Sequence, residues 1–430
     1  MNYVDYLANK RQYQIDGHVL LLEMRHACLF YKAGKGKTYP TIDAIRDIDF
    51  SMQGNAKVLI LSTATSITKM WKEDIEPQNI LPNNTVMMSF NKAIQDATKS
   101  QLLKVKWDII IVDECHHIKS HNSKISKLVF QLTKKCKYAF GLSGTPRGNS
   151  DVDIYCIFHN LHVSEWGEVT YTNFVDICCD VDRKFYNGCM IKVPIGINEK
   201  YRAGFQRNIS MYSQRIDYTD EDEMPELKID TVKIPFKPSK EYLQAEEGII
   251  KLSNYETTMT KLAAISKLHQ LANGFLYITN DYGDRETVQV QYNNKLDWIK
   301  ENLPDDYCTI VYRHEEDFVQ LMNILNHMGI SWTDDITTYK KGNTRVLLLQ
   351  CSQSESYNLQ MCGEVIFYTM DYSYINFDQM LHRFWRTGRD DTVKIKILLN
   401  ENSIDEKIWK IVNKKQTLSD LFYAIKSEEL

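Results

Sequence analysis

Short runs of valine, isoleucine and leucine recur along the chain, and each is followed by a stretch with helical periodicity. A first series occupies residues 27–33, 57–63, 108–114 and 138–144, and a second series occupies 308–314, 345–351, 364–370 and 394–400. Strands that are apolar on both sides are typical of parallel sheets with helices on both faces. Stretches such as "EEDFVQLMNILNHMG" (315–329) carry the apolar stripe of a covering helix. The pattern predicts an α/β chain with two mostly parallel sheets flanked by helices.

The two series are separated by polar segments. These are the acidic stretch "YTDEDEMPE" at 218–226 and the stretch "KPSKE" at 237–241. A chain of 430 residues has the length of about two to three domains. We therefore expect a first lobe at 1–235 and a second lobe at 236–430.

Composition excludes several classes of protein. The formal net charge of −4 argues against a protein that coats nucleic acid through bulk positive charge, but it allows a local basic groove. No apolar run reaches the roughly 18 residues of a membrane span, and the N-terminus lacks the apolar core of a signal peptide. The 10 cysteines have no disulfide-framework spacing. We expect a cytoplasmic protein with no membrane partner.

A glycine- and lysine-rich segment, "YKAGKGKTYP" at 31–40, follows the first apolar run and opens a predicted helix. A phosphate-binding loop needs this context, because backbone N–H groups and a helix N-terminus hold the phosphates. Gly34 and Gly36 allow close approach of the backbone, Lys37 can reach the phosphates and the Thr38 hydroxyl can bind Mg²⁺. Tyr31 stands where the phosphate-loop pattern has its first glycine. The alternative is a solvated, lysine-rich turn.

The apolar run "WDIIIVDE" (107–114) delivers two adjacent carboxylates at its end. Asp113 can hold Mg²⁺, and Glu114 can orient and deprotonate a water molecule. Ligands of open α/β sheets bind at the carboxyl ends of the strands, where the loop of Lys37 also lies. The sequence therefore predicts two halves of one ATP site.

A third group of residues lies in "QMLHRFWRTGR" at 379–389. Gln379, Arg383 and Arg386 follow the i, i+4, i+7 spacing of one helix face. The two guanidinium groups can point across a cleft at ATP and stabilise charge on the transferring phosphoryl group. The alternative is a surface face of salt bridges.

Several segments resemble, in order, the motifs of superfamily 2 helicases in the form of the Swi/Snf family. "DECHHIKS" looks like motif II in a DEAH-like form, and "AGKGKT" looks like motif I, in which the position of Tyr31 need not be glycine. "VLILSTATSITKMWKEDI" resembles motif Ia, with Trp71 at a family position. Further resemblances are "KRQYQIDGH" (Q motif), "LSGTPRGNS" (motif III), "SESYNLQ" (motif V) and "QMLHRFWRTGR" (motif VI).

The resemblance implies two tandem RecA-like lobes with ATP and Mg²⁺ in the cleft between them. It implies a DNA-dependent ATPase and helicase or translocase that acts on single-stranded, branched or duplex DNA. The compact form is similar to short bacteriophage and bacterial helicases, which implies a role in replication, recombination or repair, with proteins of those processes as possible partners. We expect a monomer in a bacterial or phage-infected cytoplasm. Gln14 is implied to recognise adenine, and Lys35 lies within the phosphate loop.

The resemblance also implies residues that contact DNA. Phosphate contacts are expected from Thr63 and Ala64 of motif Ia, from Ser89 and Asn91 of "MSFN", and from Asn358 of motif V. Contacts of this kind are independent of sequence and sensitive to salt.

Motifs III and V imply further roles. Ser143 and Thr145 are implied to couple the ATP site to DNA. Ser356 and Tyr357 stand where the family usually has glycines, and Arg389 stands where it often has glutamine. The ring of Tyr357 can stack on a base, or it can pack beneath motif VI.

The sequence leaves two alternatives to an ATP-driven motor. One is a non-hydrolysing nucleotide switch or scaffold on the same fold, which the altered motif V favours and the intact ATP-site residues oppose. The other is a zinc site at Cys156, His159 and His162, with Cys178 and Cys179 downstream. The usual C-x₂-C and H-x₃₋₅-H spacings are absent there, so we expect no zinc.

Overall fold

The computed structural model describes residues 2–146, 151–186, 189–219, 224–247, 249–252, 255–258, 261–279, 283–353, 359–386, 389 and 391–414. The chain divides into two compact units, Met1–Thr219 and Asp220–Leu430. The boundary expected near residue 235 lies after this division, at the end of β9 (Leu227–Ile234). Strand β9 pairs over its whole length with β18 (Val393–Asn400). This pairing ties β9 to the second unit.

The first unit contains a six-stranded sheet in the order β3-β2-β4-β5-β1-β8. Its strands are β1 (His26–Tyr31), β2 (Val58–Ser62), β3 (Thr85–Ser89), β4 (Ile109–Asp113), β5 (Tyr138–Leu142) and β8 (Ser213–Ile216). Every pairing is parallel, so all carboxyl ends lie at the same edge of the sheet.

Alternate side chains of these strands pack into two cores, one on each face of the sheet. Leu29 and Ile60 belong to the core that the first helices and η1 cover, and Phe30 and Leu61 belong to the core that the later helices cover. The first group is α1 (Tyr3–Ala8), α2 (Gln12–Met24), α3 (Thr38–Ser51) and the π-helix η1 (Ser66–Ile75). The second group is α4 (Phe90–Ala93), α5 (Asp96–Lys104), α6 (Lys124–Thr133), α7 (Asp151–Asn160), α8 (Tyr171–Cys178) and α9 (Glu199–Tyr212).

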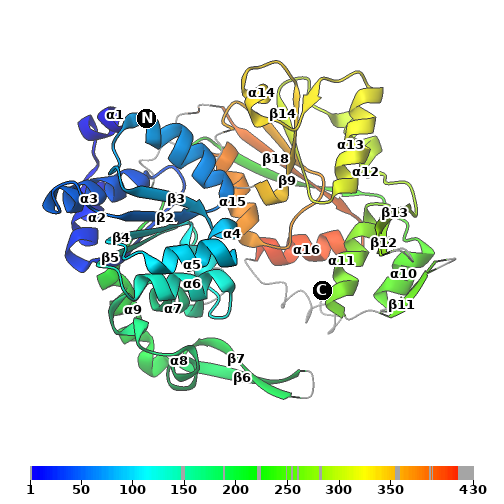
Figure 1. Cartoon of the computed structure of the whole chain (residues 1–430). Coiled ribbons are helices and arrows are strands. Elements are labelled where there is room, and N and C mark those ends of the chain that lie inside the picture. The colour runs from blue at the N-terminus through cyan, green and yellow to red at the C-terminus, as the bar shows by residue number, and fades with distance from the viewer. Residues whose placement is uncertain are drawn as a thin grey trace. The chain divides into compact units, whose positions relative to one another are not determined.

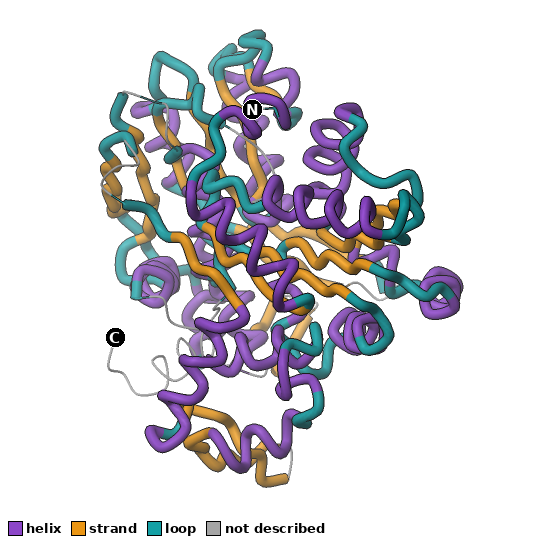
Figure 2. Tube along the Cα trace, turned by 90° about the vertical axis from the view of Figure 1, so that its left-hand side faces the viewer, coloured by secondary structure: helices purple, strands orange, loops and turns teal. Residues whose placement is uncertain are grey.

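The second unit repeats this plan with a parallel sheet in the order β15-β16-β14-β17-β18-β9. Its other strands are β14 (Cys308–Tyr312), β15 (Trp332–Thr333), β16 (Val346–Gln350) and β17 (Glu364–Phe367). One face packs against α10 (Lys240–Glu246), α11 (Lys261–Ala272), α14 (Ile336–Lys340), α15 (Tyr374–Phe384) and α16 (Ile404–Asn413). The other face packs against α12 (Lys295–Asn302) and α13 (Glu315–His327). Figure 2 shows the strands of the sheets in orange among purple helices.

Three antiparallel hairpins complete the described strands. They are β6–β7 (Cys179–Tyr186 and Cys189–Ile197), β10–β11 (Ile249–Leu252 and Tyr255–Thr258) and β12–β13 (Phe275–Thr279 and Arg285–Gln289). The β6–β7 hairpin extends away from the sheet of the first unit (Figure 1). Four short 3₁₀-helices are η2 (Glu76–Gln78), η3 (Cys115–Ile118), η4 (Ser164–Gly167) and η6 (Cys351–Gln353).

The predicted α/β fold, with two parallel sheets flanked by helices, is confirmed. The placement of ATP in a cleft between the lobes stays a prediction. Within the described part of the chain, no helix has the length and apolar character needed to cross a membrane.

Candidate nucleotide site of the first unit

The predicted phosphate loop joins β1 to α3 and has a backbone shape that suits glycine. Gly34 and Gly36 have φ angles of 82° and 73°, in the left-handed region that glycine adopts without strain. A Cβ atom at Gly36 would lie 2.7 Å from Nε2 of Gln14. The same amide donates to the backbone carbonyl of Lys35 at 3.4 Å. The Q-motif glutamine therefore contacts the loop, while its recognition of adenine stays a prediction.

Tyr31, the residue that departs from the glycine pattern, is a core residue rather than part of the loop surface. Its side chain is buried, and its hydroxyl lies within hydrogen-bond distance of the backbone carbonyl of Tyr13 (2.9 Å) and of the side chain of Gln214. A Cβ atom at Gly17 of α2 would lie 2.1 Å from this hydroxyl, so the glycine leaves room for the tyrosine. Tyr31 thus anchors the end of β1 directly before the loop begins.

Asp113 lies at the end of β4 with its carboxylate buried and held from one side. Oδ2 accepts hydrogen bonds from the hydroxyls of Ser62 (3.0 Å) and Ser66 (2.8 Å) and from the indole N–H of Trp71 (3.2 Å). Oδ1 is buried and has no hydrogen-bond partner. Burial raises the pKa of Asp113, and the neighbouring Glu114 raises this pKa further. Burying a carboxylate oxygen without a hydrogen-bond partner costs folding free energy unless a ligand binds that oxygen.

Glu114 follows in the left-handed conformation, with φ 51° and ψ 49°. This conformation is uncommon for a residue with a side chain, and such residues often lie at functional sites. Oε1 of Glu114 lies 3.5 Å from Nζ of Lys37, and both side chains are mostly buried. The structure thus brings the phosphate-loop lysine next to the carboxylate expected to activate water.

Thr38, the other expected Mg²⁺ ligand, is the first residue of α3. Its hydroxyl donates to Sδ of Met70 at 3.6 Å, so a weak acceptor on η1 holds it. Magnesium in nucleotide sites takes one or two protein oxygens, with phosphates and waters completing its shell. The hydroxyl of Thr38 and the partnerless Oδ1 of Asp113 fit this requirement.

Motif III contacts motif II through a short polar chain. Nδ1 of His116 lies 3.4 Å from Oε2 of Glu114 and 3.2 Å from the hydroxyl of Ser143. The Ser143 hydroxyl also accepts the backbone N–H of Thr145 at 3.1 Å. Ser143 and Thr145 are therefore connected to the carboxylate of Glu114, and their coupling role stays a prediction.

The residues expected to contact DNA follow two adjacent strands. Ser62 and Ser89 pair in register at the ends of β2 and β3. Thr63 and Ala64 come directly after Ser62, and Ala64 is exposed. Ser89 caps α4 by accepting the backbone N–H of Lys92 at 3.4 Å, and Asn91 is exposed in that helix. These residues share the edge that carries the nucleotide site, but DNA contact stays a prediction.

The helical spacing expected for motif VI holds only in part. Gln379 and Arg383 lie on α15, but the helix ends at Phe384, and Trp385 has an extended backbone with φ −92° and ψ 96°. The indole of Trp385 donates to a backbone carbonyl ahead of β9 at 2.8 Å, which holds the chain outside the helix. Arg386 therefore does not continue the helix face of Gln379 and Arg383, contrary to the expectation from spacing.

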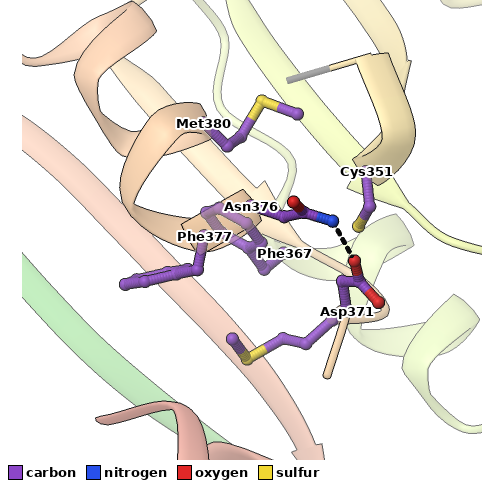
Figure 3. A pocket seen from close by; sticks show the side chains of 7 residues that line it. Cys351, Phe367, Asp371, Asn376, Phe377 and Met380 are labelled. Carbon is purple, nitrogen blue, oxygen red and sulfur yellow. Dashed lines mark hydrogen bonds between the residues drawn. The ribbon is translucent and has the colours of Figure 1, made fainter. Parts of the chain in front are cut away.

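The start of α15 is fixed by a polar contact beside a small apolar cavity. Figure 3 shows the amide of Asn376 donating to the carboxylate of Asp371, among Cys351, Phe367 and other apolar residues. The guanidinium of Arg313 also pairs with Asp371. These contacts anchor the motif VI helix to the ends of β14 and β17.

Motif V lies mostly outside the described residues, so the structure says nothing of Tyr357 and Asn358. The departure at Arg389 has a structural role. Its Nη1 donates to the carbonyl of Gln360 at 2.6 Å, and its Nη2 pairs with Asp391 at 2.5 Å. Arg389 thus ties the end of motif VI to the segment that precedes β17.

The cysteines and histidines after motif III have other partners. Nδ1 of His159 contacts the carbonyl of Trp166 at 2.9 Å, and Nδ1 of His162 contacts the hydroxyl of Thr133 at 3.2 Å. Burial lowers the pKa of His162 to about 4 and raises the pKa of Cys156 to about 12. Across the described ranges, no group of three or more His, Cys, Asp or Glu side chains is placed to hold a metal ion.

Sequence reasoning missed Ser62, Ser66 and Met70 as parts of the site. The signal that could have indicated them is position, because Ser62 ends β2 and the other two follow it, and the end of β2 lies beside Asp113 in the sheet. Trp71 stood at a family position but had no assigned role.

Comparison with known proteins agrees with the motifs. Residues 77–179 match the family described as the SNF2-related domain. Over this segment the chain is similar to the SNF2-related family. The predicted resemblance to Swi/Snf-like helicases of superfamily 2 agrees with this match and with relatives that are named ATP-dependent helicases.

Curated relatives match nearly the whole chain at low identity. The uncharacterized ATP-dependent helicase YqhH of Bacillus subtilis is 21% identical over 90% of this chain and 74% of its own length. The putative ATP-dependent helicase/translocase YwqA of the same organism is 21% identical over 95% of the chain, but the match spans only 48% of YwqA. The CHD3-type chromatin-remodeling factor PICKLE of Arabidopsis thaliana is 23% identical over 88% of the chain and 28% of its own length.

Among solved structures, the chain is similar to the Sulfolobus solfataricus SWI2/SNF2 ATPase core in complex with dsDNA. The match covers 97% of this chain and 93% of the solved chain. Its TM-score is 0.42 and its sequence identity is 19%.

Proposed function

We propose that this chain is a DNA-dependent ATPase that couples ATP hydrolysis to movement along, or remodelling of, single-stranded, branched or duplex DNA. The observation that carries the proposal is the meeting of Lys37, Asp113 and Glu114 at one edge of the first sheet, 3.5 Å apart for Lys37 Nζ and Glu114 Oε1. A non-hydrolysing scaffold needs no carboxylate poised beside the phosphate-loop lysine.

The residues divide the chemistry among them. The loop of Gly34 and Gly36 offers backbone N–H groups to the phosphates, and Lys37 offsets their charge. Glu114 orients the attacking water and accepts its proton, and the adjacent His116 holds this carboxylate from the other side. Bound Mg²⁺, held by Thr38 and Asp113, would neutralise charge on the phosphate oxygens.

The second unit is proposed to complete the site. Arg383 and Arg386 would supply guanidinium groups to the phosphoryl group during hydrolysis, and Gln379 would accompany them. The support is the resemblance of this segment to motif VI. Arg383 lies in α15, whereas Arg386 lies in the non-helical segment that follows. The two arginines can therefore contribute differently to hydrolysis.

The proposed DNA path runs over Thr63, Ala64, Ser89 and Asn91 in the first unit, and over Tyr357 and Asn358 in the second. The similarity to relatives that are named helicases, translocases and chromatin-remodeling factors supports DNA as the partner. A role in bacterial or phage replication, recombination or repair, in the cytoplasm, is part of the proposal and rests on the resemblance of the sequence to short bacteriophage and bacterial helicases. The monomeric state stays a prediction.

The decisive test compares Glu114→Gln with wild-type protein. The variant keeps the shape of the side chain but cannot accept a proton, so we expect nucleotide binding to be retained and hydrolysis to be lost by about 10²-fold or more. Binding of a fluorescent ATP analogue and phosphate release, each with and without DNA, measure the two effects. Glu76→Gln, at an exposed glutamate of the same unit, is the matched control.

Two results would contradict the proposal. Turnover of Glu114→Gln at the wild-type rate would exclude the assigned water activation. Absence of ATP hydrolysis by the wild-type protein, with and without forked, Holliday-type and blunt DNA, would instead favour the nucleotide-switch or scaffold alternative.

A further inference from the structure

The π-helix η1 contacts both expected Mg²⁺ ligands of the first unit. Ser66 and Trp71 of η1 donate to Oδ2 of Asp113, and Met70 of η1 accepts from the hydroxyl of Thr38. Within one stretch of ten residues, three side chains therefore touch the two groups that would hold the ion. π-Helical turns are rare and occur frequently at functional sites.

The hydrogen bonds to Asp113 fix which oxygen is presented. With donors from Ser62, Ser66 and Trp71 on Oδ2, the carboxylate has one orientation in which Oδ1 is left for a ligand. Trp71 is fully buried, so its indole N–H has no water to donate to if this bond is broken. The indole bond thus ties the position of η1 to the orientation of Asp113.

The other end of η1 is tied to the residues expected to contact DNA. The hydroxyl of Thr63 accepts the backbone N–H of Ser66 at 3.3 Å, and its carbonyl accepts the backbone N–H of Ile67 at 3.0 Å. The carbonyl of Ala64 accepts the hydroxyl of Thr68 at 3.0 Å. A displacement of Thr63 and Ala64 by a DNA phosphate would therefore move the first turn of η1 and its Ser66 donor.

We propose that η1 transmits DNA binding to the metal ligands, and that Trp71 is the positioning residue that holds Asp113 for Mg²⁺. This inference rests on the proposed function, because it assumes Mg²⁺ at Thr38 and Asp113 and DNA at Thr63. The alternative is that Trp71 only packs in the core between η1 and the sheet.

Trp71→Phe tests the proposal, since it keeps an aromatic ring and removes the N–H donor. The measurement is the Mg²⁺ concentration that gives half-maximal binding of a fluorescent ADP analogue. Partners that orient a metal ligand typically contribute about 10–100-fold to metal affinity, so we expect this midpoint to rise about 10-fold. Binding of the analogue without Mg²⁺ should not change.

Trp107→Phe is the matched control. Trp107 is also buried in the first unit, and its indole donates to the backbone carbonyl of Leu102 at 3.0 Å, away from Asp113. It should lower the melting temperature without changing the Mg²⁺ midpoint. If both variants lose stability and neither shifts the midpoint, Trp71 only packs in the core and the positioning role is refuted.

Ser66→Ala provides a second variant in case Trp71→Phe does not fold. It removes the hydroxyl donor of the η1 residue whose backbone N–H bonds to Thr63, and it should likewise raise the Mg²⁺ midpoint. Duplex DNA should lower the midpoint for wild-type protein and do so less for Ser66→Ala. A wild-type midpoint that DNA does not change would refute the transmission through η1. Failure of the wild-type protein to bind the analogue at all would instead refute the proposed function.

Discussion

Removal of the Lys295 side chain should cost the second unit a large part of its stability. It is fully buried, and its ammonium donates to Asp405 (2.6 Å), to Oδ1 of Asn273 (3.1 Å) and to the backbone carbonyl of Tyr368 (3.0 Å). All three N–H groups therefore have partners. The partners come from the start of α16, from the end of α11 and from the residue after β17, so one ammonium joins three elements to α12.

The cost of Lys295→Met follows from what the substitution leaves behind. The carboxylate of Asp405 has only 3% of its side chain exposed, and it would stay buried without its cation. Removing one partner of a buried ion pair costs about 3–5 kcal/mol. For a unit of this size, 1 kcal/mol corresponds to about 2–4 °C, so the melting temperature should fall by about 10 °C.

Scanning calorimetry can measure this loss, because it can separate the transitions of the two units. Lys300→Met is the matched control, since Lys300 lies on the same helix and pairs with Asp297 at the surface. Lys295→Met combined with Asp405→Leu removes both charges, and it should be less destabilised than Lys295→Met alone. The reasoning is refuted if Lys295→Met is as stable as Lys300→Met, or if the double variant is the least stable.

The remaining predictions concern chemistry, pH and DNA. Arg386→Ala should reduce turnover by about 10³-fold while changing nucleotide affinity much less; equal losses would indicate ground-state binding. Burial and nearby cations lower the pKa of His269 and His314, so stability should fall below about pH 6.5, by up to about 1.4 kcal/mol per pH unit for each. Asp317, whose pKa burial raises to about 6, should partly offset this loss between about pH 6 and 4, and urea unfolding across pH 5–8 measures the sum. Tyr357→Ala should weaken binding to single-stranded DNA more than to blunt duplex if the ring stacks on a base, and equally if it only packs.

The central strands of both sheets were predictable, and the edge strands were not. Each of the eight predicted apolar runs contains or overlaps a strand of the two six-stranded sheets, and the strands of these two sheets that were missed are β3, β8, β9 and β15. All four lie at sheet edges, where one side has no neighbouring strand. β9 shows the reason, because most of its residues are partly or fully exposed and a continuous apolar run is not required there.

Residue types and motif order predicted which side chains build the nucleotide site, but not how they are held. Lys37 was identifiable from the glycine-rich loop between a strand and a helix, and Asp113 and Glu114 were identifiable because a carboxylate pair seldom ends an apolar strand. The core role of Tyr31 depends on contacts with Tyr13 of α2 and Gln214 of β8, so no local pattern encodes it.

Strand order explains why the structural path between the proposed DNA contacts and the proposed metal ligands is short in this unit. Along the chain β2 precedes β3 and β4, but in the sheet β2 lies between them. The strand that carries Thr63 is therefore the direct neighbour of the strand that carries Asp113, at a spacing of about 4.8 Å. Ser62 already bridges the two by donating to Asp113 at 3.0 Å. A phosphate that displaced Thr63 would thus act one strand away from the metal ligand, and η1 would add a second connection through Ser66 and Trp71.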